Sequence, residues 1–170
     1  ASVTAAALKT VNDATTVNVT ATAVTAIAGT AADLASVYGG GITGLGDETV
    51  TVSNAQVTAA DLNTINSGTS VNVVATNVTQ ITGSRTALAT TYGGGISNLG
   101  DEAIIVSDSV TSAQANTIDA YTTGAVTATI STTAIGDLDD LTGTGNAYTI
   151  TVGTAQVTAA ALKIVDAATT

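Results

Sequence analysis

The chain has 170 residues and a net charge of −10, from 13 acidic residues against three lysines and arginines. So acidic a chain cannot neutralise nucleic-acid phosphates or hold an anionic membrane surface through a basic patch. It contains neither His nor Cys, which excludes disulfides, thiol chemistry, a Ser–His–Asp triad and an ordinary zinc or haem site. No apolar run approaches the roughly 18 residues that a membrane helix needs. We therefore expect no enzyme, no nucleic-acid partner and no membrane insertion.

The apolar residues are almost all Ala, Val, Ile and Leu, and Phe, Trp, Met and Pro are absent. The only aromatic residues are Tyr38, Tyr92, Tyr121 and Tyr148. A thick core built on aromatic anchors is not possible with this composition. The composition favours a core a few small aliphatic side chains deep, as in stacked repeats.

The sequence repeats itself. Residues 1–54 and 55–108 align without a gap, and about 31 of the 54 positions are identical. Residues 109–154 form a shorter, diverged third copy, and residues 155–170 begin a fourth. Because the chain begins and breaks off in the same phase of the repeat, we expect a fragment of a longer array.

Several helix starts are predicted along the chain. Thr58-Ala-Ala-Asp61 places a hydroxyl where it can accept from a free backbone N–H, with an acidic residue three positions on, as in a capping box. Thr30-Ala-Ala-Asp33 and Thr111-Ser-Ala-Gln114 repeat this arrangement, whereas Thr4 and Thr158 keep only the hydroxyl. Asp33 and Asp61 are therefore interpreted as helix caps and not as catalytic acids.

Short strands alternate with these helices. Val17-x-Val19 and Val50-x-Val52 have the period of two that is typical of a half-buried strand. The glycine triplets Gly39–Gly41 and Gly93–Gly95 are predicted to end the preceding helices in left-handed backbone. The recurring unit is thus a short strand, a bend, a short helix and a return.

This unit predicts a repeat protein: a solenoid of short β-strands and short helices, either a β-solenoid or a leucine-rich-repeat-like α/β solenoid. The strands would stack in register at about 4.8 Å per turn. The competing interpretation is a string of separate α+β domains of 54 residues. Domains so small and so poor in aromatic residues would be marginally stable.

Three stretches resemble a known class of tandem arrays: Thr58 to Ile65, Thr30 to Leu34, and Gly41 to Val50. Similar Thr/Ala/Val-rich, low-aromatic repeats occur in giant secreted and cell-surface proteins of marine cyanobacteria and other bacteria. The resemblance covers nearly the whole chain but contains no catalytic signature, and the third copy lacks the Tyr-Gly-Gly-Gly segment. It implies an extracellular or cell-surface location and a structural or adhesive role.

Carboxylates are the only candidates for chemistry. Asp47–Glu48 and Asp101–Glu102 recur with the repeat, and we interpret both pairs as solvated turns, because an active site would have to be duplicated with them. The densest acidic loop contains Asp137, Asp139 and Asp140. Clustered carboxylates are what Ca²⁺ requires, so these three residues are the candidate metal ligands, although they lack EF-hand spacing.

The sequence therefore predicts a structural module of a large extracellular protein, forming a rigid rod or fibre by stacking and head-to-tail self-association. The alternative is an adhesin stalk or ligand-binding array that recognises polysaccharide or a cell surface, with or without calcium. Sugar sites usually need exposed aromatic platforms. Outward-facing Tyr38 and Tyr92 would favour this alternative.

Overall fold

The computed structural model describes residues 1–153 and 156–169. The chain divides into two compact units. Unit 1 comprises residues 1–79 and 90–99, and unit 2 comprises residues 80–89 and 100–170. Residues 154, 155 and 170 lie outside the described part, so the start of the fourth repeat is described only from Gln156 onward.

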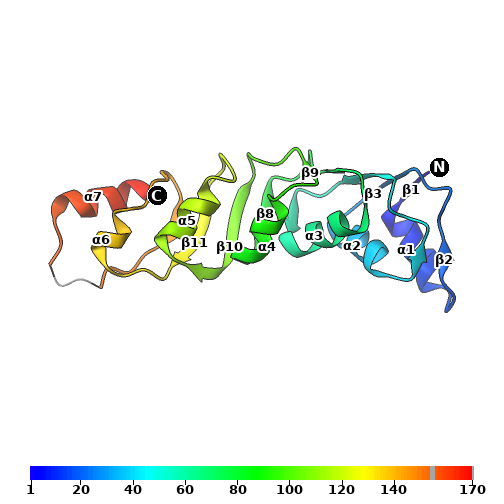
Figure 1. Ribbon diagram of the computed structural model, residues 1–170, viewed down its shortest axis with the longest axis horizontal. Coiled ribbons are helices and arrows are strands. Elements are labelled where there is room, and N and C mark those ends of the chain that lie inside the picture. Colours follow the sequence, from blue (N-terminus) through cyan, green and yellow to red (C-terminus); the bar gives the residue numbers. More distant parts are fainter. Residues whose placement is uncertain (154–155, 170) are drawn as a thin grey trace. The chain divides into compact units, whose positions relative to one another are not determined.

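Unit 1 is built from short parallel strands and three helices that lie side by side (Figure 1). Its strands are β1 (Ser2–Thr4), β2 (Val19–Thr20), β3 (Ala26–Gly29), β4 (Ile42–Thr43), β5 (Thr49–Val52), β6 (Gln56–Thr58), β7 (Val73–Val74) and β9 (Ile96–Ser97). Its helices are α1 (Ala5–Asp13), α2 (Ala31–Gly39) and α3 (Ala59–Gly68). The end of α4 (Arg85–Thr91) also falls in this unit.

The main sheet of unit 1 has the strand order β1-β3-β5-β7-β9, and β2 and β4 form a separate two-stranded sheet. All the pairings described within it are parallel. Ser2 lies opposite Ala26, and Ala26 lies opposite Thr49. Each strand of the main sheet is therefore joined to the next by a crossover, which parallel pairing requires.

Unit 2 contains β8 (Gln80–Gly83), β10 (Ala103–Val110), β11 (Val126–Ile130) and β12 (Ala147–Thr149). Its helices are most of α4, α5 (Ser112–Asp119), α6 (Ile135–Leu138) and α7 (Ala159–Ala168). The strands lie in the order β12-β11-β10-β8 and are parallel. The register between β10 and β11 shifts between Ile105 and Ser109, so one long strand follows a bend in the sheet.

The predicted helix caps are confirmed. The hydroxyl oxygens of Thr4, Thr30, Thr58, Thr111 and Thr158 each accept a hydrogen bond from the backbone N–H three residues later. Thr111 and Gln114 form both bonds of a capping box. Each cap satisfies one of the N–H groups that a helix start leaves without a partner.

A second set of caps, on α2, α4 and α5, comes from a later strand or from the loop directly after one. Asn54 Oδ1 accepts from the Ala31 N–H at 2.8 Å, and Asp108 Oδ1 accepts from the Arg85 N–H at 2.8 Å. Thr132 Oγ1 accepts from the Ser112 N–H at 3.1 Å in the same way. Each of these bonds joins the first residue of a helix to a residue 20 to 23 positions later in the chain.

The role predicted for the glycine triplets is only partly correct. Gly94 and Gly95 have positive φ values of 127° and 86°. No residue of Gly39–Gly41 does, and α2 instead ends at Gly40 in extended backbone (φ −98°, ψ −167°). A Cβ at Gly40 would lie 2.8 Å from the Ser36 carbonyl oxygen, so this position needs a glycine for space and not for a left-handed turn.

The predicted solenoid is wrong. The chain forms an α/β fold with three mostly parallel sheets and, among the described residues, seven helices, divided between two compact units. In unit 1, consecutive strands do not pair, because the main sheet skips β2 and β4, which pair with each other. Separate 54-residue domains are wrong too, since β5 pairs with β7 across the repeat boundary (Thr51 opposite Val74).

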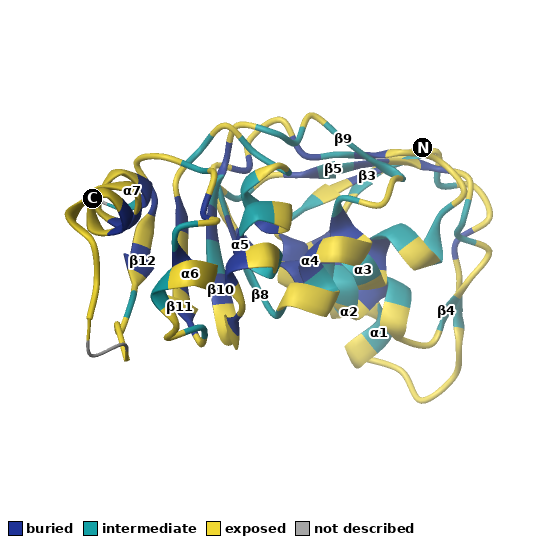
Figure 2. Cartoon of the chain, turned by 60° about the vertical axis from the view of Figure 1, so that its left-hand side comes forward, coloured by how far each residue is buried: buried dark blue, intermediate teal, exposed yellow. Residues whose placement is uncertain are grey.

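Burial follows the composition. The largest fully buried apolar side chains are aliphatic: Ile27, Leu34, Val37, Leu62, Ile65, Ile81, Leu88, Ile104, Ile118 and Leu138. Figure 2 shows buried positions, in dark blue, on both strands and helices. None of the described helices is long and apolar enough to span a membrane, which agrees with the expectation of no membrane insertion.

Candidate functional site

A polar groove crosses the outer face of the helices of unit 1. Its volume is about 660 Å³. It is lined by Lys9, Asn12 and Asp13 of α1, by Ala32, Ala35, Ser36, Val37 and Gly39 of α2 with Gly40 and Ile42 after it, and by Asp61 and Thr64 of α3. The parallel crossovers bring these three helices together, so residues far apart in sequence share one surface.

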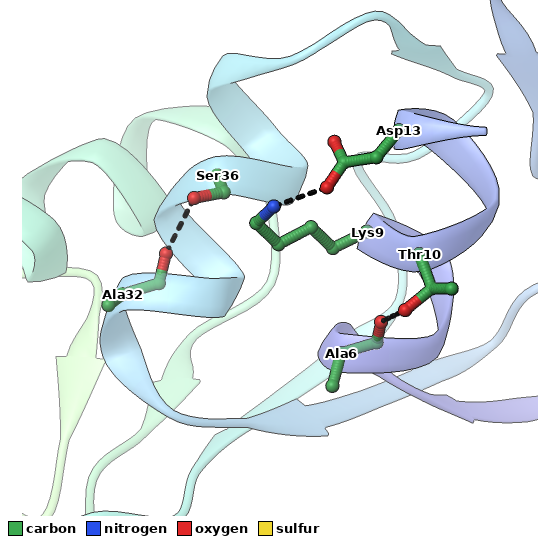
Figure 3. Close-up of polar contacts among 6 residues, drawn as sticks. All are labelled: Ala6, Lys9, Thr10, Asp13, Ala32 and Ser36. Atoms are coloured by element: carbon green, nitrogen blue, oxygen red, sulfur yellow. Dashed lines mark hydrogen bonds and ion pairs between the residues drawn. The ribbon is translucent and has the colours of Figure 1, made fainter. Parts of the chain in front are cut away.

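Among the residues that line this groove, Lys9 is basic, and Asp13 and Asp61 are acidic. The Lys9 ammonium donates to Asp13 Oδ2 at 2.5 Å, four residues later on the same helix. Figure 3 shows Lys9 extended from α1 toward the turn of α2 that carries Ser36. The pKa of Lys9 is raised, first by the hydrogen bond to Asp13 and the charge of Asp13, and to a smaller extent by the charge of Asp33.

The hydroxyls beside Lys9 are engaged with their own helices. Thr10 Oγ1 donates to the Ala6 carbonyl at 2.8 Å, and Ser36 Oγ donates to the Ala32 carbonyl at 2.9 Å (Figure 3). Each hydroxyl thus offers only acceptor capacity to a ligand. In the bonds described, neither hydroxyl contacts a general base that could activate it as a nucleophile.

Unit 1 contains a buried carboxyl group just before β5. Glu48 is 0% exposed. Tyr38 Oη donates to Glu48 Oε1, and the Gly46 N–H donates to Glu48 Oε2 at 2.7 Å. The interpretation of Asp47–Glu48 as a solvated turn is therefore wrong for Glu48, whereas Asp47 is exposed. A buried acid with these donors is a structural clamp between α2 and the turn before β5.

The second repeat contains the same clamp position. Glu102 is 1% exposed, and its Oε2 accepts from the Gly100 N–H at 2.8 Å. The solvated turn predicted at Asp101–Glu102 is thus wrong at Glu102 as well. The sequence did contain a signal for the first clamp: a tyrosine stands ten positions before the glutamate in both repeats, as Tyr38 before Glu48 and Tyr92 before Glu102.

Tyr38 is not an exposed aromatic platform. Its ring lies against Gly68, where an added Cβ would come within 2.5 Å of Tyr38 Cδ1, and its hydroxyl is held by Glu48. Burial, followed by the hydrogen bond to Glu48, raises the pKa of Tyr38 well above its usual range. This arrangement removes one of the two tyrosines on which a sugar-binding interpretation depended.

The predicted calcium ligands lie around the short helix α6. Asp137 and Asp140 are exposed, Asp139 is half-buried, and Asp137 and Asp140 line a shallow pocket with Thr111 and Asn116. Within residues 1–153 and 156–169, no group of three or more acidic side chains is arranged to hold a metal ion. Calcium binding at Asp137, Asp139 and Asp140 stays a prediction from the sequence.

Unit 2 contains a buried polar cluster that the sequence did not indicate. Asn146 is 1% exposed; its Nδ2 donates to Asp119 Oδ1 at 2.7 Å, and its Oδ1 accepts from the Val126 N–H at 2.8 Å. Nearby, the Tyr148 hydroxyl is buried and has no hydrogen-bond partner among the described residues. Burial, and then the charge of Asp119, raises the pKa of Tyr148 to about 12.

An apolar groove of about 630 Å³ lies between β12 and α7. Its lining includes Tyr148, Ile150, Val152, Leu162 and Val165. The exposed fractions are 37% for Val152, 38% for Val157, 42% for Leu162 and 43% for Ile164. These side chains are large for so exposed a position, and they gather on one helix and the segments beside it.

A scan against protein-family models, a search of curated proteins and a search of solved structures each find no match for this chain. The resemblance to secreted bacterial repeat arrays therefore stays a prediction.

Proposed function

We propose that the chain is a non-enzymatic structural module of a larger extracellular or cell-surface protein, and that it associates head to tail with other copies or repeats. The observation that carries this proposal is that a repetitive chain has an edge strand in one unit and exposed apolar side chains in the other. In unit 1, β1 is an edge strand of a parallel sheet. In unit 2, Val157, Leu162 and Ile164 are exposed.

The physical basis is the way in which repeats stabilise one another. A repeat buries its apolar face against its neighbours, and an edge strand presents unpaired N–H and C=O groups to any strand of suitable register. The acidic surface opposes non-specific aggregation, because like charges repel. Association is thereby limited to the complementary surfaces.

Sedimentation velocity of the 170-residue chain over a wide range of concentrations tests this proposal. The expected result is a series of species that grows with concentration. A single monomeric species up to the solubility limit would contradict it. Repeating the series with calcium and then with excess chelator also tests whether divalent cations bridge the acidic surfaces, since such bridges would dissolve in chelator.

A second candidate function, binding of polysaccharide, is favoured by the polar groove over α1–α3, whose lining combines Lys9, Asn12, Asp61 and Thr64. It is weakened by the engagement of Tyr38 with Glu48. A glycan array probed with the wild-type chain and with Asn12→Ala separates the two candidates. Binding lost in the variant would support the groove as a sugar site, and no binding of any glycan would leave this candidate without support.

A further inference from the structure

Seven consecutive residues occur twice in the chain: Val3–Lys9 and Val157–Lys163 have the same sequence, Val-Thr-Ala-Ala-Ala-Leu-Lys. We call residues 2–15 the head segment and residues 156–169 the tail segment. Both form a capped helix, and the cap distances agree: Ala7 N to Thr4 Oγ1 and Ala161 N to Thr158 Oγ1 are each 3.2 Å. The start of the helix is thus the same in the two segments, whereas residues 2–4 form β1 and residues 156–158 form no strand.

The two segments bury different, neighbouring sides of this helix. The head segment buries Ala5 and Leu8, which are 0% and 9% exposed, and leaves Val11 54% exposed. In the tail segment, Leu162, the counterpart of Leu8, is 42% exposed, and Val165, the counterpart of Val11, is 7% exposed. Figure 2 shows the exposed outer side of α7. The tail segment lacks the neighbour that the head segment has.

That neighbour is the surface formed by β3 and α2. In the head segment, Ser2 and Thr4 lie opposite Ala26 and Ala28 in parallel register. Ala5 packs so closely on Gly29 that an added Cβ there would lie 2.6 Å from Ala5 Cβ. Ala159 has the same size as Ala5, so the tail segment satisfies this steric requirement.

The charges agree as well. Lys9 lies near Asp33 of α2, whose carboxylate contributes to the raised pKa of Lys9. Lys163 would take the place of Lys9. Lys9 forms an ion pair with Asp13. The residue of the tail segment that corresponds to Asp13 is Ala167. Lys163 therefore brings a charge complementary to Asp33 without a helical partner four residues later.

We infer that the tail segment of one copy docks on the β3–α2 surface of a second copy, in place of that copy's own head segment. This inference rests on the proposed head-to-tail association and specifies its contacts. α7 would then bury Ala159, Leu162 and Val165 together, as α3 buries Ala59, Leu62 and Ile65, which are all 0% exposed.

The exchange replaces the contacts of Ala5 and Leu8 with the same contacts from Ala159 and Leu162, whereas Asp166 and Ala167 take the places of Asn12 and Asp13. The tail helix is already packed on unit 2 through Ala161, Val165 and Ala168, whereas the released head segment regains conformational freedom. Against this gain stands the loss of translational and rotational freedom on association. The association must therefore depend on concentration and must strengthen when the head segment is weakened.

Sedimentation velocity of four full-length variants tests the inference. Leu162→Asp should raise the concentration needed for association by about tenfold or more, since it buries a charge without a partner. Ile164→Asp is the matched control: Ile164 is 43% exposed, but its counterpart Thr10 stays exposed in the docked head segment, so the association should be unchanged. Leu8→Asp frees the β3–α2 surface and should lower the required concentration. Val11→Asp, on the free face of α1, should have no effect.

Each other pattern overturns the inference. Equal losses in Leu162→Asp and Ile164→Asp would indicate non-specific apolar contact, and a loss in Val11→Asp would indicate that α7 packs on α1 without exchange. In both cases the proposed function would still hold, because the wild-type chain would still associate with itself. A chain that stays monomeric both as wild type and as Leu8→Asp, with a folded circular-dichroism spectrum, would overturn the inference and the proposed function together.

Discussion

The head segment of unit 1 and the tail segment of unit 2 share seven consecutive residues, yet they differ in what they bury. Leu8 is 9% exposed and Leu162 is 42% exposed. Helix formation and capping are the same in both, since they depend on the segment's own threonine and alanines. Burial depends on whether a partner strand and helix are present. The comparison therefore separates what the local sequence decides from what the neighbours decide.

The largest expected difference concerns these two leucines. Leu8→Ala should lower the free energy of unfolding by about 2 kcal/mol or more, because it opens a cavity against β3 and α2. Leu162→Ala should cost less than about 1 kcal/mol, since its side chain is already partly in water. Urea unfolding at low protein concentration measures both. Equal losses would mean that the two segments have equivalent surroundings.

Half-buried Tyr38 and buried Tyr148 make a second matched pair. Tyr38→Phe removes the donor to buried Glu48 and should cost about 1–3 kcal/mol of unfolding free energy. Tyr148→Phe removes a buried hydroxyl without a partner, and should be neutral or slightly stabilising. Urea unfolding of both variants measures these free energies. A destabilised Tyr148→Phe variant would contradict the contrast between the two sites.

The threonine caps should behave alike in the two segments. Thr4→Ala and Thr158→Ala each remove one hydrogen bond at a helix start, and each should cost about 1 kcal/mol. Hydrogen exchange of the Ala7 and Ala161 amides reports the loss locally. A loss confined to one segment would show that capping, too, depends on the neighbours.

The last effect is confined to alkaline pH. An unfolded tyrosine ionises near pH 10, but folded Tyr148 keeps its proton up to about 12. The unfolded state then binds fewer protons, so this residue's contribution to stability is complete below about pH 10 and is lost as pH rises toward about 12. Tyr148→Phe should have a shallower decline over this interval than wild type. Identical slopes would show that Tyr148 does not contribute.

Much of the secondary structure was predictable, because helix starts depend on local chemistry. Thr58-Ala-Ala-Asp61 and Thr111-Ser-Ala-Gln114 indicated caps that the structure contains. The arrangement of strands was not predictable in the same way, since pairing joins residues such as Ser2 and Ala26 that no local pattern connects. The solenoid prediction failed at this level: a repeated unit does not determine which strands become neighbours.

The candidate site shows the same limit. Glu48 stands next to Asp47 in an apparently polar turn, so its own surroundings in the sequence suggested solvent. Its burial depends on Tyr38, ten residues earlier, whose hydroxyl reaches it only after α2 has folded back. Asn146 likewise depends on Asp119, 27 residues earlier. Buried polar groups are set by partners distant in the chain.

The central claim, that the tail segment pairs with β3 of a second copy, can be tested by a disulfide between copies, because the chain contains no cysteine. The register of Ser2 with Ala26 places Gln156 of the tail segment opposite Ala26 of the second copy. Neighbouring strands lie about 4.8 Å apart, within the Cα separation that a disulfide spans. A chain with Gln156→Cys, mixed with a chain with Ala26→Cys, should form a covalent heterodimer on mild oxidation. Mixing the first chain with an Ala23→Cys chain should give little, and equal yields from the two mixtures would contradict the account.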